Sequence, residues 1–333
     1  MKKLLYFLYY LNKTDWAKFS KFLQYGSNVT ENSKAKLIAD NVLSLFQYNI
    51  SFLDYFYFRF YEKDKTERLK WAGTGYMYEY HLIMNPKKRR HILENKIEFL
   101  HSYSEFVKRN FADIVTLQTN PDKVEELLNS KTGKIVLKLS NGQVGKEVKV
   151  YETKSFTAKS LVEEMKHKHF DLAEEYVVQH STLMELSPTG LNTVRIFTQL
   201  EEENVIFLGA RLRISVNSQV DNLGAGNIAA PVDMVSGKVN GPGIYSDITK
   251  QDEIIHPITL QKIEGFQVPY WDDVITMVKK ASLLHPENKS IGWDIAITAI
   301  GPELIEGNHN WCKLLWQLPV KQGLKPMIEK YMV

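Results

Sequence analysis

The sequence predicts an α+β protein with a helical region at its N-terminal end. Residues 1–95 carry helical patterns and many aromatic side chains, whereas the chain beyond residue 172 consists mostly of alternating segments typical of strands. Repeated strand–helix–strand units, which would predict a parallel dinucleotide-binding sheet, do not occur. We therefore expect a helical region at 1–95 followed by two mixed units at 96–178 and 179–333.

The apolar start of the chain, Met1–Leu11, imitates a secretion signal but is short and lacks a small-residue cleavage pattern. No stretch reaches the ~18 apolar residues that a membrane span requires. We expect a first helix of the folded protein and no stable membrane insertion, while peripheral contact with a membrane surface stays open. The aromatic stretch Phe46–Tyr61 predicts a core or an interface. The basic run Lys87–Arg90 is either a phosphate patch or, more simply, a solvated helix face.

The unit at 96–178 is predicted to alternate short helices with strands. Its expected elements are a helix through Phe99–Val107, a strand near Ile114–Leu117, a helix beginning near Pro121, strands at Lys134–Lys138 and Val148–Tyr151, and a helix around Ser160–His167. After this helix the chain is predicted to be mostly strands. These are Leu172–Gln179, Leu191–Leu200, Val205–Ser215 and Ile228–Val232, with one helix at Trp271–Leu284 before a final hairpin.

That hairpin, Ile291–Asn310, is the most informative segment. It turns at Ile300–Pro302, so Asp294 lies opposite Glu306, and Asn308 projects from the same side as Glu306. Two carboxylates facing each other across a ladder repel. A divalent cation would reverse the sign of that interaction, because hard cations bind carboxylates, amide oxygens and substrate phosphates. The alternative is an exposed hairpin whose carboxylates diverge into water.

A second candidate site is the loop Lys138–Lys146, which follows a predicted strand. Gly142 and Gly145 let the backbone approach a ligand closely, and successive amides can surround phosphate oxygens. Lys138 adds a positive charge at the strand end. The loop lacks the ending of a Walker A motif, and a glycine-containing hairpin turn explains it equally well.

Several polar groups lie on the strands that follow. Glu174 can accept a hydrogen bond from the amino group of a base, although an edge strand is the simpler reading of Asp171–His180. Arg195, Arg211 and Arg213 on predicted strands need anionic partners, either a phosphate or an internal carboxylate. The loop Asp221–Asn227 can close over a substrate or simply connect two strands.

The order of these motifs resembles the sugar-transfer-associated branch of the ATP-grasp superfamily. The matching segments are Asn192–Arg195, Asp221–Asn227, His256-Pro257, Gly292–Asp294 and Glu306–Asn308. The likeness covers about residues 96–317 and does not clearly include the first 90. It implies an ATP-grasp fold, in which two α+β subdomains grip ATP.

The resemblance also implies roles for individual residues. Lys96 and Lys138 would bind the nucleotide phosphates, and the loop at 140–146 would close over them. The implied nucleotide-binding residues are Lys96, Lys138, Ser140, Gly142, Gly145, Lys146, Glu174, Glu175, Val177 and His180, of which Glu174, Glu175 and Val177 would hold the adenine and His180 the ribose. The implied catalytic residues are Arg195, Arg213 and Lys138; the substrate-binding residues are Asn192, Asn222, Gly224 and Gly226; and the ligands of two Mg²⁺ ions are Asp294, Glu306 and Asn308.

Three positions depart from the family pattern. Leu139 replaces a proline after the loop lysine, and Glu147 replaces a loop glycine; both bear on the closed geometry of the loop. Asn227 occupies a usual glycine position, which bears on substrate fit.

The resemblance implies an ADP-forming ligase that joins a carboxylate to an amine through an acyl-phosphate. The expected substrates are a sugar acid, an amino sugar or an amino acid in polysaccharide or capsule biosynthesis. A kinase with a stable phosphorylated product is one alternative, and a non-catalytic partner of a glycosyltransferase is another.

Composition fits these expectations and limits others. Of the 333 residues, 44% are hydrophobic and 24% are charged, which is ordinary for a globular protein. The 42 basic residues nearly balance the 39 acidic ones, so a nucleic-acid partner is not expected. Cys312 is the only cysteine, which excludes an internal disulfide and a cysteine-rich zinc site and favours the cytoplasm.

Overall fold

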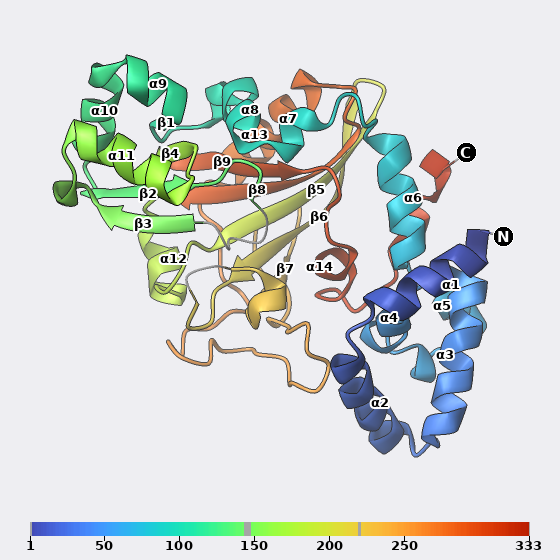
Figure 1. Ribbon diagram of the computed structural model, residues 1–333. Helices are drawn as coiled ribbons and strands as arrows, with labels where there is room; N and C mark the ends of the chain where they lie inside the picture. Colours follow the sequence, from blue (N-terminus) through green and yellow to red (C-terminus); the bar gives the residue numbers. More distant parts are fainter. Residues whose placement is uncertain (1, 143–147, 219–220, 333) are drawn as a thin grey trace.

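The computed structural model describes residues 2–142, 148–218 and 221–332, and its strands form two antiparallel sheets (Figure 1). The smaller sheet has the order β1-β4-β2-β3, with strands Phe111–Asp113 (β1), Lys134–Lys138 (β2), Val148–Glu152 (β3) and Leu172–Glu175 (β4). The larger sheet has the order β7-β6-β5-β8-β9, with strands Thr193–Glu201 (β5), Asn204–Ile214 (β6), Ile228–Val232 (β7), Ser290–Thr298 (β8) and Gly301–Asn308 (β9). The α+β prediction is confirmed.

The N-terminal helices are α1 (Lys2–Lys13), α2 (Trp16–Thr30), α3 (Lys34–Tyr48), α4 (Phe52–Tyr57), α5 (Lys65–Leu69), α6 (Thr74–Met84), α7 (His91–Glu94) and α8 (Lys96–Ser102). Of these helices, α1 to α6 gather beside the larger sheet at the right of Figure 1, whereas α7 and α8 lie at the top of the view. The aromatic stretch of the sequence fills the core of the N-terminal helices, because Tyr55, Phe56 and Phe60 are fully buried. The first helix and the aromatic core are therefore confirmed.

Three helices cover the smaller sheet: α9 (Ile114–Thr119), α10 (Pro121–Leu128) and α11 (Ala158–Lys168). The predicted strand near Ile114–Leu117 is wrong, because that segment is α9. The carboxylate of Asp113 accepts a hydrogen bond from the Thr116 amide at 2.8 Å and caps the helix, while Leu117 packs into the core. The predicted helix through Phe99–Val107 is also interrupted, since α8 ends at Ser102.

The remaining helices accompany the larger sheet. They are α12 (Ser181–Leu186), α13 (Trp271–Leu284) and α14 (Lys313–Gln317). Apolar residues of α13 pack against Trp293 and its neighbours in the main core, and the predicted bounds of α13 and β7 agree with those observed. The predicted strand Leu172–Gln179 is too long, because β4 ends at Glu175.

Short 3₁₀ helices complete the described structure: η1 (Phe60–Glu62), η2 (Ser104–Phe106), η3 (Thr153–Ser155), η4 (Leu223–Ala225), η5 (Lys325–Met327) and η6 (Glu329–Met332). Among the described residues, no helix has both the length and the apolar character needed to cross a bilayer. The division at residues 95 and 178 stays a prediction.

Candidate functional site

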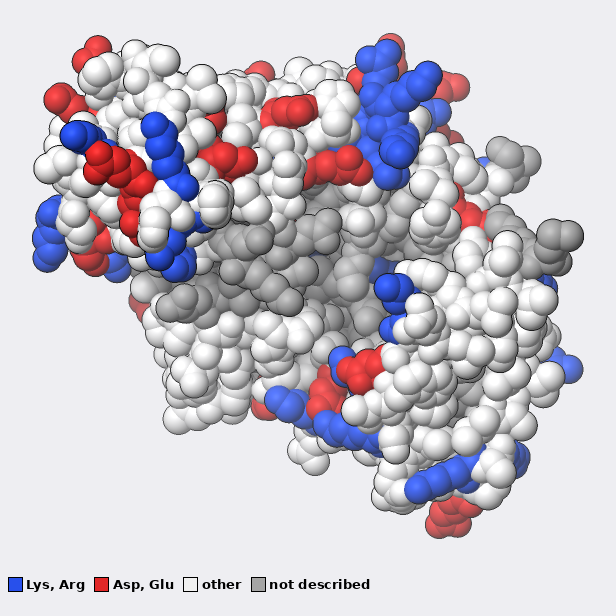
Figure 2. Space-filling view, viewed as in Figure 1, with Lys and Arg blue, Asp and Glu red and all other residues white. Residues whose placement is uncertain are grey.

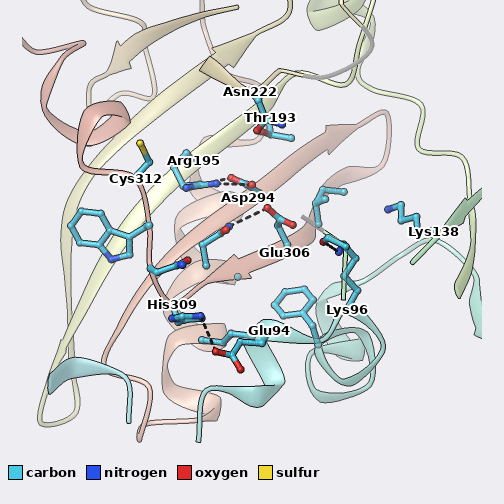
Figure 3. Close-up of a pocket in the computed structure, with 18 of the residues that line it drawn as sticks. Glu94, Lys96, Lys138, Thr193, Arg195, Asn222, Asp294, Glu306, His309 and Cys312 are labelled. Carbon is cyan, nitrogen blue, oxygen red and sulfur yellow. Dashed lines mark hydrogen bonds and ion pairs between the residues drawn. The ribbon is translucent and has the colours of Figure 1, made fainter. Parts of the chain in front are cut away.

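A pocket of about 820 Å³ opens between the two sheets. The smaller sheet contributes Lys138 from the end of β2, and the larger sheet contributes Arg195, Arg213, Asp294 and Glu306. Figure 3 shows Asp294 and Glu306 in the middle of this pocket, with Lys96 and Lys138 on one side and Cys312 on the other. The pocket therefore brings together charged groups that lie up to about 200 residues apart in the sequence.

The predicted pairing of Asp294 with Glu306 is confirmed, but the predicted turn at Ile300–Pro302 is wrong, because β9 already begins at Gly301 and the pairs nearer the turn are shifted by one residue. Asp294 of β8 pairs with Glu306 of β9, and the register shifts at a bulge directly after Asp294. Asn308 lines the same pocket, where its side-chain Nδ2 donates to Glu306 Oε1 at 3.2 Å and to the carbonyl of Gly292 at 3.3 Å. These two hydrogen bonds leave the amide oxygen of Asn308 available on the pocket side of the hairpin.

Arginines, rather than solvent, surround the carboxylate of Asp294. Arg195 donates to it from Nε and, at 2.8 Å, from Nη2, while Arg213 Nη1 donates to its Oδ2 at 2.8 Å. Arg213 Nη2 also donates at 2.6 Å to Asp221 and at 2.6 Å to the Asn222 side chain. Internal carboxylates are therefore the partners of Arg195 and Arg213 in this structure.

Among the described residues, three carboxylates share two guanidinium groups here, which leaves one excess negative charge that the nearby Lys96 offsets in part. Burial would raise the pKa of Asp294, but Arg195 and Arg213 outweigh it and hold that pKa well below its usual range. Burial raises the pKa of Glu306, and the neighbouring Asp294 charge raises it further. Burial also raises the pKa of Asp221 despite the attraction of Arg213. The excess charge therefore resides mainly between Asp294 and Glu306.

These donors fit a hard divalent cation. Glu306 and Asn308 offer a carboxylate and an amide oxygen next to Asp294, and a cation would balance the excess charge. No group of three or more His, Cys, Asp or Glu side chains suited to a metal exists among the described residues. A cation here would thus complete its shell with water and ligand oxygens, which is the habit of Mg²⁺.

Two lysines approach from the side of the smaller sheet. Lys96 Nζ donates to the carbonyls of Leu139 at 3.4 Å, Ser140 at 3.2 Å and Gly142, and burial lowers its pKa. Lys138 Nζ donates to Glu174 Oε2 at 2.9 Å. Both lysines line the pocket together with Gly142. Of the other predicted loop residues, Gly145 and Lys146 lie outside the described part of the chain, as does Glu147.

Ser140 and the predicted adenine-binding residues do not line the pocket. The Ser140 hydroxyl donates to Asp171 at 2.5 Å. Glu174 is buried against Lys138 and Arg109, and these two charges outweigh its desolvation and lower its pKa to about 2. Glu175 accepts a hydrogen bond from Ser130 Oγ at 3.1 Å.

Val177 and His180 also lie away from the pocket. Val177 follows the end of β4. His180 Nδ1 caps α12 by accepting from the Thr182 amide at 3.3 Å, and its ring packs on the edge of Tyr270.

The predicted substrate residues are similarly divided. Asn222 lines the pocket, whereas Asn192 is fully buried and donates to Gln179 Oε1 at 2.9 Å. Gly224 and Gly226 form the turn η4, where Gly226 has a φ of 88° that favours glycine. Asn227 is also fully buried: its side chain accepts from the Val216 amide at 2.7 Å and donates to the Asn222 carbonyl at 3.1 Å. The departure at Asn227 thus stabilises this loop.

Sequence reasoning missed several residues around the pocket. Asp221 is one, although it begins the loop that was singled out. Arg109, which does not line the pocket, is another: it donates to Glu174 of β4 at 2.8 Å and to Glu303 of β9 at 2.9 Å, so it joins the two sheets. The pocket wall also includes Arg90, Glu94, Phe99, Thr193, Ile305, His309, Asn310, Trp311 and Cys312. No local pattern around Arg109 predicts this role.

Two antiparallel units with a charged pocket between them define this molecule as an ATP-grasp protein. The chain belongs to the sugar-transfer associated ATP-grasp family, whose model matches residues 76–332. The family and fold predicted from the sequence motifs are confirmed, and the match extends about twenty residues further toward the N-terminus than expected.

Several solved structures are similar to this chain at low sequence identity. One is the biotin carboxylase domain of the Hydrogenobacter thermophilus 2-oxoglutarate carboxylase in complex with MgADP (12% identity, TM-score 0.43, 75% of this chain and 52% of that chain). Others are an L-amino acid ligase from Bacillus licheniformis (14%, 0.40, 71% and 48%) and a D-alanyl-alanine synthetase A from Vibrio cholerae (10%, 0.40, 72% and 60%). The chain thus spans about half the length of the first two. No curated protein sequence matches the chain.

Proposed function

We propose that this protein is an ATP- and Mg²⁺-dependent ligase that joins a carboxylate to an amine and releases ADP and phosphate. The observation that carries the proposal is the single pocket in which two lysines face an acidic pair backed by two arginines. Membership of the sugar-transfer associated family supports a sugar-linked substrate, such as a sugar acid, an amino sugar or an amino acid joined to either.

In this proposal the lysines bind the nucleotide phosphates. Lys96 and Lys138 lie on the same side of the pocket, and Lys96 donates to carbonyls of the loop after β2. Lys138 must exchange part of its contact with Glu174 for a phosphate oxygen, and Glu174 keeps its partner Arg109 when this happens. The proposed adenine and ribose contacts of Glu174, Glu175, Val177 and His180 stay predictions, as do Ser140, Gly145 and Lys146.

Asp294, Glu306 and Asn308 would hold the Mg²⁺ ions, predicted to be two. Bound there, magnesium would neutralise phosphate charge during transfer. Arg195 and Arg213 keep Asp294 ionised and oriented in the pocket. The same arginines can donate to the transferred phosphoryl group, because each carries several N–H donors in a rigid plane.

The proposed reaction has two steps. A carboxylate oxygen of the first substrate attacks the γ-phosphorus of ATP, the bond to the bridging oxygen breaks, and ADP leaves. The amine nitrogen of the second substrate then attacks the acyl carbon, phosphate leaves, and the nitrogen loses a proton to give the amide. No nucleophile from the protein is needed, so the side chains act by positioning and charge neutralisation.

The decisive experiment is an ADP-release screen over pairs of sugar acids, amino sugars and amino acids, with products identified by mass. We expect ADP release that requires both an acid and an amine, and a product equal to their sum minus water. Release with one substrate alone and a stable phosphorylated product would favour a kinase. Absence of any Mg²⁺-dependent thermal shift with ATP would favour a non-catalytic partner, for example of a glycosyltransferase.

Glu306→Gln tests the metal assignment most directly, because it keeps the size of the side chain and removes the charge. We expect turnover to fall by about 10²–10³-fold, the usual cost of removing one preorganised electrostatic group. Glu264→Gln, at an exposed position outside the pocket, is the matched control and should keep full turnover. Undiminished turnover in Glu306→Gln would refute the assignment.

A further inference from the structure

Helix α1 is apolar on the side that faces solvent as well as on the side that packs inward. Tyr10 is buried, and Phe7 packs against Phe46. On the outer side the exposed fractions are 56% for Leu4, 63% for Leu5, 54% for Leu8 and 56% for Tyr9. A helix that is apolar all round is normally buried, so this outer side is expected to meet a partner.

Helix α6 extends the same surface. Its residues Tyr78, Leu82 and Ile83 are 57%, 44% and 52% exposed. The Tyr6 hydroxyl on α1 donates to the Glu79 carboxylate on α6 at 2.9 Å, so the two helices touch. Leu82 and Ile83 follow Glu79 by three and four residues and lie on its side of α6, while Tyr9 follows Tyr6 by three. Tyr9 therefore lies beside the exposed side chains of α6, and Leu8, Leu5 and Leu4 continue the exposed apolar surface around α1. We call this surface the apolar face; it consists of Leu4, Leu5, Leu8, Tyr9, Tyr78, Leu82 and Ile83.

Positive charge borders this apolar face. Lys87, Lys88 and Arg89 are exposed and follow the end of α6 through a turn at Pro86. Figure 2 shows lysine and arginine side chains gathered over the link between α6 and α7. The sequence of α1 contains no acidic residue, and the one acidic residue of α6 is Glu79, which accepts from Tyr6. The border of the face is therefore basic.

We propose that this apolar face binds the surface of an anionic lipid bilayer. Apolar and aromatic side chains on a helix lying flat, bordered by lysine and arginine, are the chemistry of interfacial membrane binding. A second copy of the chain fits less well, because pairing of two such faces would bring basic borders together. The inference goes beyond the proposed ligase, since it concerns a surface outside the pocket. Membrane binding would hold the enzyme close to lipid-linked or membrane-bound substrates.

Flotation of the full-length protein with lipid vesicles tests the proposal. We expect binding to vesicles of phosphatidylcholine mixed with phosphatidylglycerol and much weaker binding to phosphatidylcholine alone. Leu5→Glu combined with Leu8→Glu should weaken binding at least about tenfold, because each change removes an exposed leucine that would enter the bilayer and adds a charge that anionic lipid repels. Val235→Glu combined with Ile258→Glu, at positions 89% and 51% exposed elsewhere, is the matched control and should bind normally.

A charge pair tests the basic border separately. Lys87→Gln combined with Lys88→Gln should weaken binding to the anionic vesicles about tenfold or more, since each lysine near such a surface contributes about fivefold. Lys166→Gln combined with Lys168→Gln on α11 should have no effect. The proposal is overturned if the wild type ignores anionic vesicles, if the leucine variant floats like the control, or if light scattering shows a dimer that the leucine variant dissociates. A failed ligase screen would leave these outcomes unchanged.

Discussion

Replacing Glu306 with glutamine should stabilise the protein without Mg²⁺, although the residue is proposed to be essential for activity. Glu306 faces Asp294 across the β8–β9 ladder, and the three carboxylates of the cluster outnumber its two arginines. Directly opposed residues have Cβ atoms about 5 Å apart, and two unit charges at that distance repel by about 3 kcal/mol at an effective dielectric constant of about 20. Attraction to Arg195 and Arg213 offsets part of this, so we expect a net gain of about 1–2 kcal/mol at neutral pH.

The gain should depend on pH, because the pKa of Glu306 is raised in the folded state. A carboxyl group whose pKa is raised by folding does not destabilise the protein at a pH where it is protonated in both the folded and the unfolded state. The cost begins as the pH rises through the unfolded-state pKa of about 4.3 and is complete above the folded-state pKa. The advantage of Glu306→Gln over the wild type should therefore be small near pH 4 and should grow toward neutral pH.

Urea unfolding across this pH range, with and without Mg²⁺ and ATP, measures both effects. Without ligands the variant should unfold at higher urea than the wild type at neutral pH, and Glu264→Gln should match the wild type. With Mg²⁺ and ATP the order should reverse, because binding stabilises only the protein that retains the site. A variant that is no more stable at neutral pH, or that gains as much as the wild type from Mg²⁺ and ATP, would refute this reasoning.

Three further changes have expected outcomes. Arg109→Met should destabilise the protein by about 3–5 kcal/mol in urea unfolding, because Glu174 and Glu303 would lose a buried charge partner. Lys138→Gln should cost about 1–3 kcal/mol at neutral pH and raise the pH midpoint of acid unfolding. Without Lys138, the ionised Glu174 contributes less to stability. That contribution is present above the unfolded-state pKa of Glu174 and is lost as the pH falls toward its folded-state pKa of about 2. ATP with Mg²⁺ should slow the reaction of the Cys312 thiol with an aromatic disulfide several-fold, since Cys312 lines the pocket.

Each of these outcomes has a clear contrary result. Arg109→Met with wild-type stability would mean that the two sheets are joined by other contacts. An unchanged acid midpoint for Lys138→Gln would mean that Arg109 alone keeps Glu174 ionised. Equal thiol reaction rates with and without ATP would place the nucleotide away from Cys312.

The sequence predicted the larger sheet well because its signals are local. Alternation indicates that β8 and β9 pair, but counting from the observed turn would place Asp294 opposite Ile305, and the bulge after Asp294 brings Glu306 opposite it instead. The strand prediction at Ile114–Leu117 is wrong because the apolar residues of this segment fit a short strand as well as a helix. The side chain of Asp113 caps this helix and so favours it over a strand. A pattern of apolar residues does not reveal such a cap.

The charge partners in the site could not be predicted in the same way. Arg109 meets Glu174 and Glu303, which are 65 and 194 residues away, and nothing in their neighbourhoods indicates the pairing. The arginines on β5 and β6 were recognised as needing anions, but a phosphate and an internal carboxylate satisfy that need equally. The choice depends on which groups the folded sheet places opposite them.

That choice also changes which residue of the hairpin matters most for a cation. In the sequence Asp294 and Glu306 form a symmetric repulsive pair that a metal would relieve equally. In the folded protein Asp294 already has two arginine partners, whereas Glu306 has hydrogen bonds with the Asn308 amide and with Asp294 and forms no ion pair among the described residues. The uncompensated charge belongs to Glu306, so a cation should gain most of its electrostatic stabilisation there. Asp294, by contrast, is held in place by Arg195 and Arg213. These arginines can turn toward a phosphate once a cation neutralises part of the Asp294 charge.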